Sequence, residues 1–116
     1  MEPVETYRVL ASADRQYLLY ELRERSGEST ITALARRVAV RRHRTTRENL
    51  SGAEIDRARI RLVHIHLPKL RDRDLIDVDW SDGTVTFTDD PAVETLFEAT
   101  AELDDWPPEP HLSTPS

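Results

Sequence analysis

The stretch from Ser51 to Thr88 constrains the fold most, because it predicts a long helix that leads directly into a two-stranded hairpin. Ser51 and Glu54 have the spacing of a capping box, in which each side chain accepts a hydrogen bond from the other residue's backbone N–H. Apolar residues follow at steps of three and four, as on one stripe of a helix: Ile55, Ala58, Leu62, Val63, Ile65, Leu67 and Leu70. We expect a kink or a break at Pro68, which lacks an N–H and would clash with the carbonyl of His64.

The hairpin is indicated by strict alternation of apolar and polar residues. Its first strand alternates apolar residues with aspartates from Ile76 to Trp80, and Ser81-Asp82-Gly83 predicts the turn. Its second strand alternates threonines with Val85 and Phe87. Both strands therefore have one face suited to packing on a core.

Two shorter helices are predicted upstream of this stretch. The first is capped by Ser12 and runs to about Arg25. The second is capped by Ser29 or Thr30 and ends near Val40. These two helices precede the long helix in the order that a helix-turn-helix requires.

The remaining segments complete the predicted fold. Residues 5–10 predict one or two helical turns, and residues 41–50 have no apolar period and predict a loop. Two helices, a long third helix and a hairpin are the layout of a winged helix-turn-helix domain. The predicted fold class is therefore mainly α with a small β-hairpin (α+β).

A last helix is predicted over residues 91–103, because Asp90 is a good N-cap and Pro91 suits the first helical position. Its apolar stripe is wider than a small core needs, so the helix either forms a two-fold homodimer or lies back on the first helix. Residues 105–116 contain four prolines and predict a disordered, Pro-rich acidic tail. Residues 1–104 are then one winged helix-turn-helix domain.

Composition excludes several classes of protein. The longest apolar run falls short of the ~18 residues that span a membrane, and the N-terminal residues lack the pattern of a signal peptide. The chain has no cysteine, which excludes disulfides and thiolate metal sites and fits a cytoplasmic protein. Arginine supplies 15 of the 16 basic residues, and together with abundant acidic residues this resembles the proteins of salt-loving archaea.

The net charge of −6 is distributed unevenly along the chain. Residues 1–32 carry a net charge of −2, residues 33–73 carry +8, and residues 74–116 carry −12 with no basic residue at all. A basic middle segment can contact nucleic acid even when the whole chain is acidic, because phosphate contacts depend on the local charge. The overall acidity can reflect a saline solvent rather than a function.

The basic segment predicts contacts with double-stranded DNA. Arg57 and Arg61 lie four residues apart on the long helix, where we expect them nearest the bases in the major groove. The arginines expected to contact phosphates lie in the preceding loop: Arg41, Arg42, Arg44 and Arg47. The alternative is a solvated arginine-rich face whose charges pair with the acidic C-terminal third of the chain.

The predicted wing argues partly against DNA contact. Asp77, Asp79 and Asp82 lie in or beside the hairpin, where a wing that enters the minor groove usually offers Arg or Lys. Phosphate would repel such a wing. Either the wing stays clear of DNA and only packs on the core, or the domain does not bind DNA.

No motif predicts catalysis, a metal or a cofactor. His64 and His66 lie two residues apart, so on a helix they point in nearly opposite directions, and no third ligand is suitably spaced. The chain has no phosphate-binding glycine loop and no nucleophile elbow. We therefore expect a protein that is not an enzyme.

Four segments resemble a large haloarchaeal family of short winged-helix proteins that is described as a domain of unknown function. They are VLASADRQYLLYELRER (9–25), ITALARRVA (31–39), RIRLVHIHLPKLRDRDLIDVD (59–79) and DGTVTFT (82–88). The resemblance covers about residues 5–103 and implies a winged-helix fold with a DNA-binding or regulatory role. The chain departs from the usual pattern at Arg73-Asp74, where winged-helix proteins often have a glycine.

Two functional hypotheses follow from the sequence. The first is a dimeric transcriptional regulator of the winged-helix type, with the recognition helix near residues 51–67. The alternative is a winged-helix protein–protein interaction module that does not bind DNA, and that uses either its basic face or its acidic wing and helix 91–103. Substitution of Arg57 and Arg61 separates the two hypotheses, because only the regulator would lose specific DNA binding.

Overall fold

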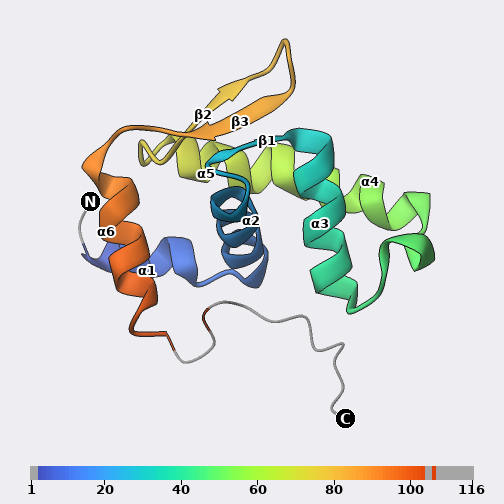
Figure 1. Cartoon of the computed structure of the whole chain (residues 1–116), viewed down its shortest axis with the longest axis horizontal. Helices are drawn as coiled ribbons and strands as arrows, with labels where there is room; N and C mark the ends of the chain where they lie inside the picture. The colour runs from blue at the N-terminus through green and yellow to red at the C-terminus, as the bar shows by residue number, and fades with distance from the viewer. Residues whose placement is uncertain (1–2, 104–105, 107–116) are drawn as a thin grey trace.

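The computed structural model describes residues 3–103 and Trp106. The helices are α1 (Pro3–Leu10), α2 (Ala13–Glu24), α3 (Ile31–His43), α4 (Gly52–Arg61), α5 (Leu67–Arg71) and α6 (Pro91–Thr100), with a 3₁₀ turn η1 (Arg47–Asn49) and a π-helical segment η2 (Leu62–His66). The strands are β1 (Glu28–Thr30), β2 (Ile76–Asp79) and β3 (Thr84–Phe87). Figure 1 shows the helices gathered beneath a small sheet, in a winged-helix-like α+β arrangement that confirms the predicted fold class.

Four predicted helix starts are confirmed by their caps. Ser12, Thr30 and Asp90 each accept a hydrogen bond from a backbone N–H of the first turn of the helix that follows. Ser51 and Glu54 form the full capping box, with the Ser51 N–H donating to Glu54 Oε1 at 2.9 Å and the Glu54 N–H donating to Ser51 Oγ at 3.1 Å. These caps satisfy backbone donors that a helix cannot satisfy internally.

The predicted loop at residues 41–50 is shorter than expected. Helix α3 does not end near Val40 but continues to His43, so Arg41 and Arg42 are helical. Arg44 then ends the helix in the left-handed conformation, with φ of 50°. Arg47 lies in the 3₁₀ turn before Ser51.

The sheet has three strands in the order β1-β3-β2, all antiparallel. Strand β1 was not predicted, because it is only three residues long and depends on pairing with β3. The hairpin is confirmed, with Val78 opposite Val85 and Ile76 opposite Phe87. The prediction that the first strand extends to Trp80 is wrong. Strand β2 ends at Asp79, and Trp80 lies in the turn with 49% of its surface exposed.

Pro68 does not break the long helix into two separate helices, which was one of the two outcomes we expected. Helical backbone continues from Gly52 through Arg71, and the five residues before Leu67 widen into a π-helix. The Leu67 N–H consequently donates to the carbonyl of Leu62, five residues back. The wider turn accommodates a proline that can neither donate to the carbonyl of His64 nor pack closely against it.

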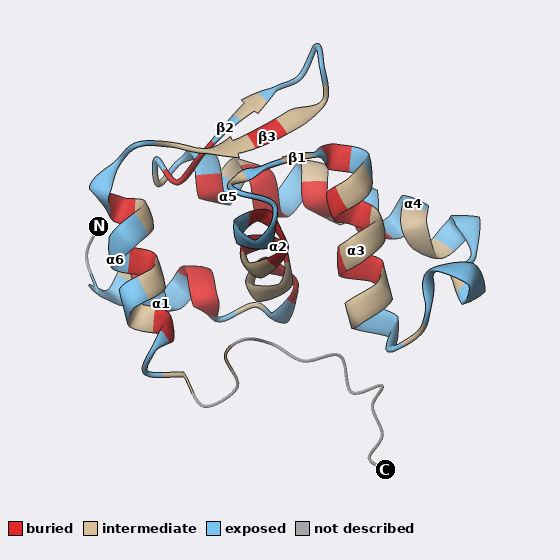
Figure 2. Ribbon diagram, viewed as in Figure 1, coloured by how far each residue is buried: buried red, intermediate tan, exposed pale blue. Residues whose placement is uncertain are grey.

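One hydrophobic core lies where α2, α3, the long helix and β3 face one another, as the buried residues in Figure 2 show. Its largest fully buried side chains are Leu18, Leu19, Leu22, Leu34, Leu62, Leu67, Leu70, Leu75, Leu96 and Val85. The predicted stripe of the long helix is wrong at Ile65, which is 42% exposed, because the π-helical turn changes the periodicity there. None of the described helices is both long and apolar enough to cross a membrane.

The apolar stripe of α6 is covered by the chain itself. Ala92 and Leu96 are buried in the core, and Phe97 packs edge-on against Phe87 at a centroid distance of 5.5 Å. The Tyr7 hydroxyl donates to Glu102 at 2.7 Å and links α1 to the segment after α6. The stripe that suggested a homodimer through helix 91–103 is therefore occupied within one chain.

Trp106 is the one residue of the predicted tail, 105–116, that the structure describes. Its ring lies edge-on to Tyr20 of α2 and Phe97 of α6, at centroid distances of 6.0 and 6.1 Å, and it packs against the core. The rest of the predicted tail, residues 105 and 107–116, lies outside the described residues.

Candidate nucleic-acid interface

Asp14 joins the three helices of the helix-turn-helix. It lies in the first turn of α2, is only 6% exposed, and accepts a hydrogen bond from Arg42 Nη1 at 2.7 Å. Arg61 Nε lies 3.4 Å from the same carboxylate oxygen, Oδ2, and His66 Nε2 lies 3.7 Å from it. One carboxylate on α2 thus holds the end of α3 and the middle of the long helix.

The charges around Asp14 keep it ionised. Burial alone would raise the pKa of its carboxyl, but His66, Arg42 and Arg61 together outweigh that effect and hold the pKa below its ordinary value. Arg61 belongs to this cluster because its Nε lies 3.4 Å from the Asp14 carboxylate, and its Nε and Nη2 atoms are buried without a hydrogen-bond partner among the described residues. Its side chain is 27% exposed, so most of it faces inward.

Glu21 forms a second cluster on α2. It is 7% exposed and accepts a hydrogen bond from Arg41 Nε at 2.7 Å, while Arg25 lies 3.2 Å and Arg37 3.9 Å from its carboxylate. The Arg41 guanidinium also lies 4.9 Å from the centre of the Tyr20 ring, within the range of a cation–π contact. Arg41 therefore ties α3 to α2, as Arg42 does one residue later.

The six arginines predicted to contact DNA fall into two groups. Arg41, Arg42 and Arg61 form intramolecular ion pairs with Glu21 and Asp14. The others are exposed and have no carboxylate of the described residues within 4.0 Å: Arg44, Arg47 and Arg57. The six therefore differ in whether a carboxylate of the described residues already pairs with them.

The outer face of α4 carries a different set of side chains from the predicted pair. Arg57 and Arg59 are both exposed on this helix but, being two residues apart, they project from opposite flanks of its exposed side, whereas Arg61 turns inward. A shallow groove beside Arg59, on the flank away from Arg57, is lined by Asp56, Arg59, Ile60, Val63 and His64. Ile60 is 58% exposed, so this face is mixed in character rather than uniformly basic.

The two histidines of the long helix have different surroundings. His64 is exposed in the groove, while His66 is buried, with its Nδ1 3.4 Å from Arg15 Nη1. His66 lies beside Asp14, as a core-edge histidine would. Arg15 also donates from Nε to the carbonyl of Val9 at 2.9 Å, which fixes α1 to the same cluster.

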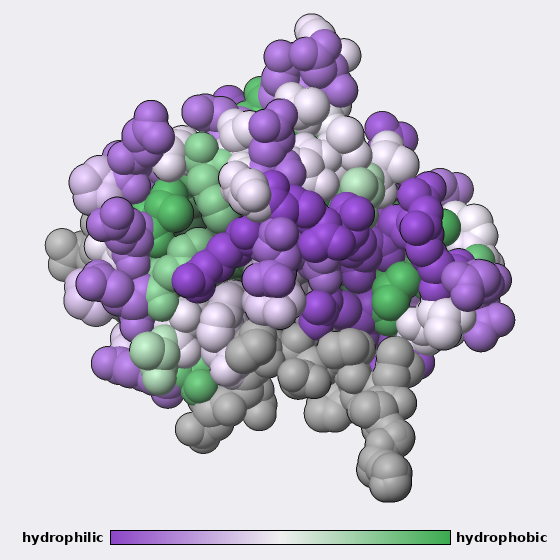
Figure 3. All heavy atoms as spheres, in the orientation of Figure 1, coloured by the Kyte–Doolittle hydropathy of each residue, from purple (hydrophilic) through white to green (hydrophobic). Residues whose placement is uncertain are grey.

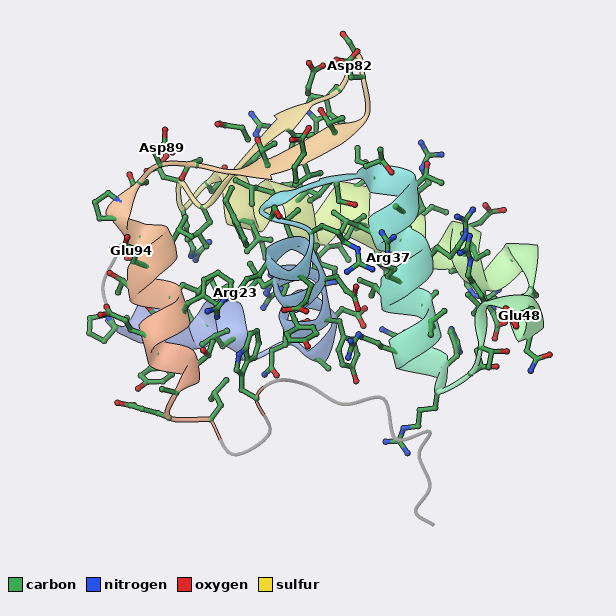
Figure 4. All side chains as sticks on the ribbon, in the orientation of Figure 1. Arg23, Arg37, Glu48, Asp82, Asp89 and Glu94 are labelled. Carbon is green, nitrogen blue, oxygen red and sulfur yellow. The ribbon has the colours of Figure 1, made fainter. Side chains whose placement is uncertain are left out.

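The wing is acidic at its tip. Figure 4 shows Asp82 at the end of the β2–β3 hairpin, directed away from the helices. Asp79 is part of the turn itself, since its Oδ1 accepts hydrogen bonds from the N–H groups of Ser81 and Asp82 at 3.0 and 3.1 Å. Only part of the wing's negative charge is therefore engaged in turn structure, and the rest repels phosphate.

The spacing of acidic residues on α2 contains a signal for these clusters. Asp14, Leu18 and Glu21 lie on one face of α2, and acidic residues on a core-facing stripe are seldom buried without basic partners. Two carboxylates seven residues apart on such a stripe predict that two arginines from other helices will form intramolecular ion pairs with them. Which arginines pair depends on the tertiary arrangement.

Comparison with known proteins identifies a family but no function. A family model described as a domain of unknown function (DUF7344) matches residues 7–86. A search of curated proteins and a search of solved structures give no significant match. The matched region spans most of α1 through β3, so it includes the helix-turn-helix and the wing. This chain is a member of the DUF7344 family of domains of unknown function.

Proposed function

We propose that this protein is a sequence-specific regulator that binds double-stranded DNA through the outer face of α4. The observation that carries the proposal is the position of Arg57 and Arg59, which flank the exposed side of the helix that follows α3 and have no described carboxylate within 4.0 Å. A guanidinium on such a helix can donate two hydrogen bonds to the major-groove edge of guanine.

The arginines that pair with Asp14 and Glu21 hold the helices of this interface in place. Arg42 and Arg61 converge on Asp14, and Arg41 binds Glu21, so α3 and the long helix are both held to buried carboxylates of α2. A reading helix has to be held rigidly, because base contacts demand accurate placement of side chains. Arg44, exposed at the end of α3, would contact a DNA phosphate beside the major groove.

The acidic wing limits how DNA can approach. Asp82 at the tip would be repelled by a phosphate backbone, so the proposed complex uses α4 with the wing held clear of the minor groove. At the high salt concentration that the composition suggests, the contribution of phosphate contacts to DNA affinity weakens strongly. Base contacts then have to supply more of the affinity.

Selection from random-sequence duplex DNA, followed by sequencing of the retained fragments, tests the proposal. The selection is run from low salt to molar KCl. Enrichment of one motif at high salt supports a sequence-specific regulator, and an inverted repeat in that motif would indicate a dimer on DNA. Binding that is uniform across sequences and disappears as the salt concentration rises would mean that only phosphate contacts supply the affinity. That result contradicts the proposed base contacts.

A protein-interaction module is the second candidate, and the apolar residues of the outer surface favour it. Ile60 and Ile65 on the long helix and Trp80 on the wing are 58%, 42% and 49% exposed. Ile60 could also contact a thymine methyl group in the major groove. Ile60→Ser therefore discriminates: a changed base preference supports the regulator, and full DNA binding with loss of a protein partner supports the module.

A further inference from the structure

A cavity lined mainly by arginines lies on the surface of α3 that faces away from the core. It has a volume of about 280 Å³, near the lower end of small-molecule sites. Its charged lining comes from three places in the fold: Glu21 on α2 with Arg25 directly after that helix, Arg36, Arg37 and Arg41 on α3, and Arg47 on η1. Figure 4 shows Arg37 on α3 beside α2, and Figure 3 shows a hydrophilic band across this face.

The charges in the cavity do not balance. Five guanidinium groups surround one carboxylate, that of Glu21, which is already within 4.0 Å of Arg25, Arg37 and Arg41. Arg36 and Arg47 have no carboxylate of the described residues within that distance. The part of the chain that the structure describes therefore leaves an excess of positive charge in a partly enclosed space.

The electrostatics at Arg37 reflect the same excess. Burial lowers the pKa of its guanidinium, and the neighbouring charges of Arg25, Arg47 and Arg36 lower it further, against the opposing effect of Glu21. Like charges gathered in this way repel one another unless an anion joins them. Ala33 and Val40 form a small apolar part of the wall, which leaves the guanidinium groups as the main hydrogen-bond donors.

The cavity is separate from the outer face of α4. The α4–α5 helix runs behind α3 in Figure 1, and its buried residues Ala58 and Leu62 face the core, so its exposed residues point to the far side. The cavity residues Ala33, Arg37 and Val40 lie on the side of α3 opposite its buried residues and beside α2. A ligand in the cavity and a DNA duplex on α4 would thus occupy different surfaces.

We infer that this cavity binds a small, multiply charged oxyanion of the phosphate type, such as the diphosphate group of a small molecule. Guanidinium groups match such oxyanions because their planar forks donate paired hydrogen bonds to two oxygens. An anion held between Arg25, Arg36 and Arg47 would connect α2, α3 and η1. Because η1 lies just before the capping box of α4, occupancy would fix the start of the DNA-facing helix.

Isothermal titration of the full chain with pyrophosphate, at fixed low KCl, tests the inference. Arg36→Gln is the informative variant, because this half-buried arginine has no described carboxylate partner to disturb, and about a tenfold loss of affinity is expected. Glu21→Gln should act in the opposite direction and tighten binding. Arg8→Gln and Arg59→Gln remove the same charge elsewhere and should leave the affinity unchanged.

Three results would overturn the inference. They are no heat of binding with the unaltered chain, equal loss of affinity in Arg36→Gln and Arg8→Gln, and loss of duplex DNA binding in Arg36→Gln without any binding of pyrophosphate. The last result would assign the cavity to the DNA backbone. Pyrophosphate binding that persists in the Arg57→Gln, Arg59→Gln double variant supports the inference even if DNA binding fails altogether.

Discussion

The Nη1 atom of Arg42 lies 2.7 Å from Oδ2 of Asp14 and joins the last turn of α3 to the first turn of α2. Arg61 of α4 approaches the same oxygen at 3.4 Å. A single buried carboxylate therefore sets the geometry of the helix pair that carries the proposed DNA-binding face. Arginines that looked like DNA ligands in the sequence hold that face in place.

Asp14→Asn should lower the free energy of unfolding by about 2–3 kcal/mol, because removing one partner of a buried pair leaves the other charges uncompensated. Part of the usual penalty is avoided, since Arg42 retains 44% of its side-chain surface in solvent. Urea denaturation followed by circular dichroism measures the change. Asp89→Asn, at an exposed position before α6, is the control and should change stability by less than about 0.5 kcal/mol.

The stability contributed by Asp14 should depend on pH in one direction. Its folded-state pKa is below the ordinary value of 3.8, so near that pH the unfolded chain binds the proton more readily. The contribution is complete above the ordinary pKa and is lost as the pH falls from there through the lowered folded value. Denaturation of the unaltered chain and of Asp14→Asn across acidic pH should show the difference between them shrinking as the pH falls. A constant difference would contradict the ion-pair account.

The sequence predicts the local features of this fold well. Ser12, Thr30, Ser51 and Asp90 act as caps because a cap depends on a few neighbouring residues, and the hairpin follows from alternation within one short stretch. Strand β1 escapes prediction since it exists through pairing with β3. The π-helical turn before Pro68 shows that a proline can alter the period of a helix while the helix continues.

The candidate site is less predictable for a related physical reason. Whether an arginine reads DNA or pairs internally depends on which carboxylate lies within reach in three dimensions. Arg57 and Arg61 look equivalent in the sequence, yet only Arg61 lies beside Asp14. The aromatic contact of Trp106 with Tyr20 likewise links residues far apart in the chain, in a segment whose proline content predicts disorder.

Trp106→Ala should destabilise the domain by about 1–2 kcal/mol, because the ring is partly buried against Tyr20 and Phe97 and loses two edge-on aromatic contacts. Trp80→Ala is the matched control, since Trp80 is 49% exposed in the hairpin turn and should change stability little. Thermal unfolding of both variants provides the comparison. Equal effects of the two substitutions would show that Trp106 does not pack on the domain.

Asp74 occupies the left-handed conformation, with φ of 59°, at the turn where winged-helix proteins often have a glycine. The Leu75 N–H bonds back to the Leu70 carbonyl at 3.1 Å, so this conformation ends the long helix. Asp74→Ala should destabilise the chain by about 1 kcal/mol, because alanine is strained at positive φ and lacks the short polar side chain. Asp74→Gly should be neutral or stabilising, and the two variants are compared by urea denaturation. A less stable glycine variant would refute this account of the turn.

The most direct test of the proposed interface is a titration of the ¹⁵N-labelled chain with duplex DNA, observed through its amide and arginine side-chain N–H signals. The account predicts the largest shifts on the outer face of α4, at Arg57, Arg59, Ile60 and the Nε–H of both arginines, with little change at Asp82 or Arg36. The signals of Arg42 and Arg61 should move less, because their guanidinium groups stay paired with Asp14. Shifts confined to the arginine cavity or the wing, or no shifts even at low salt, would contradict the central claim.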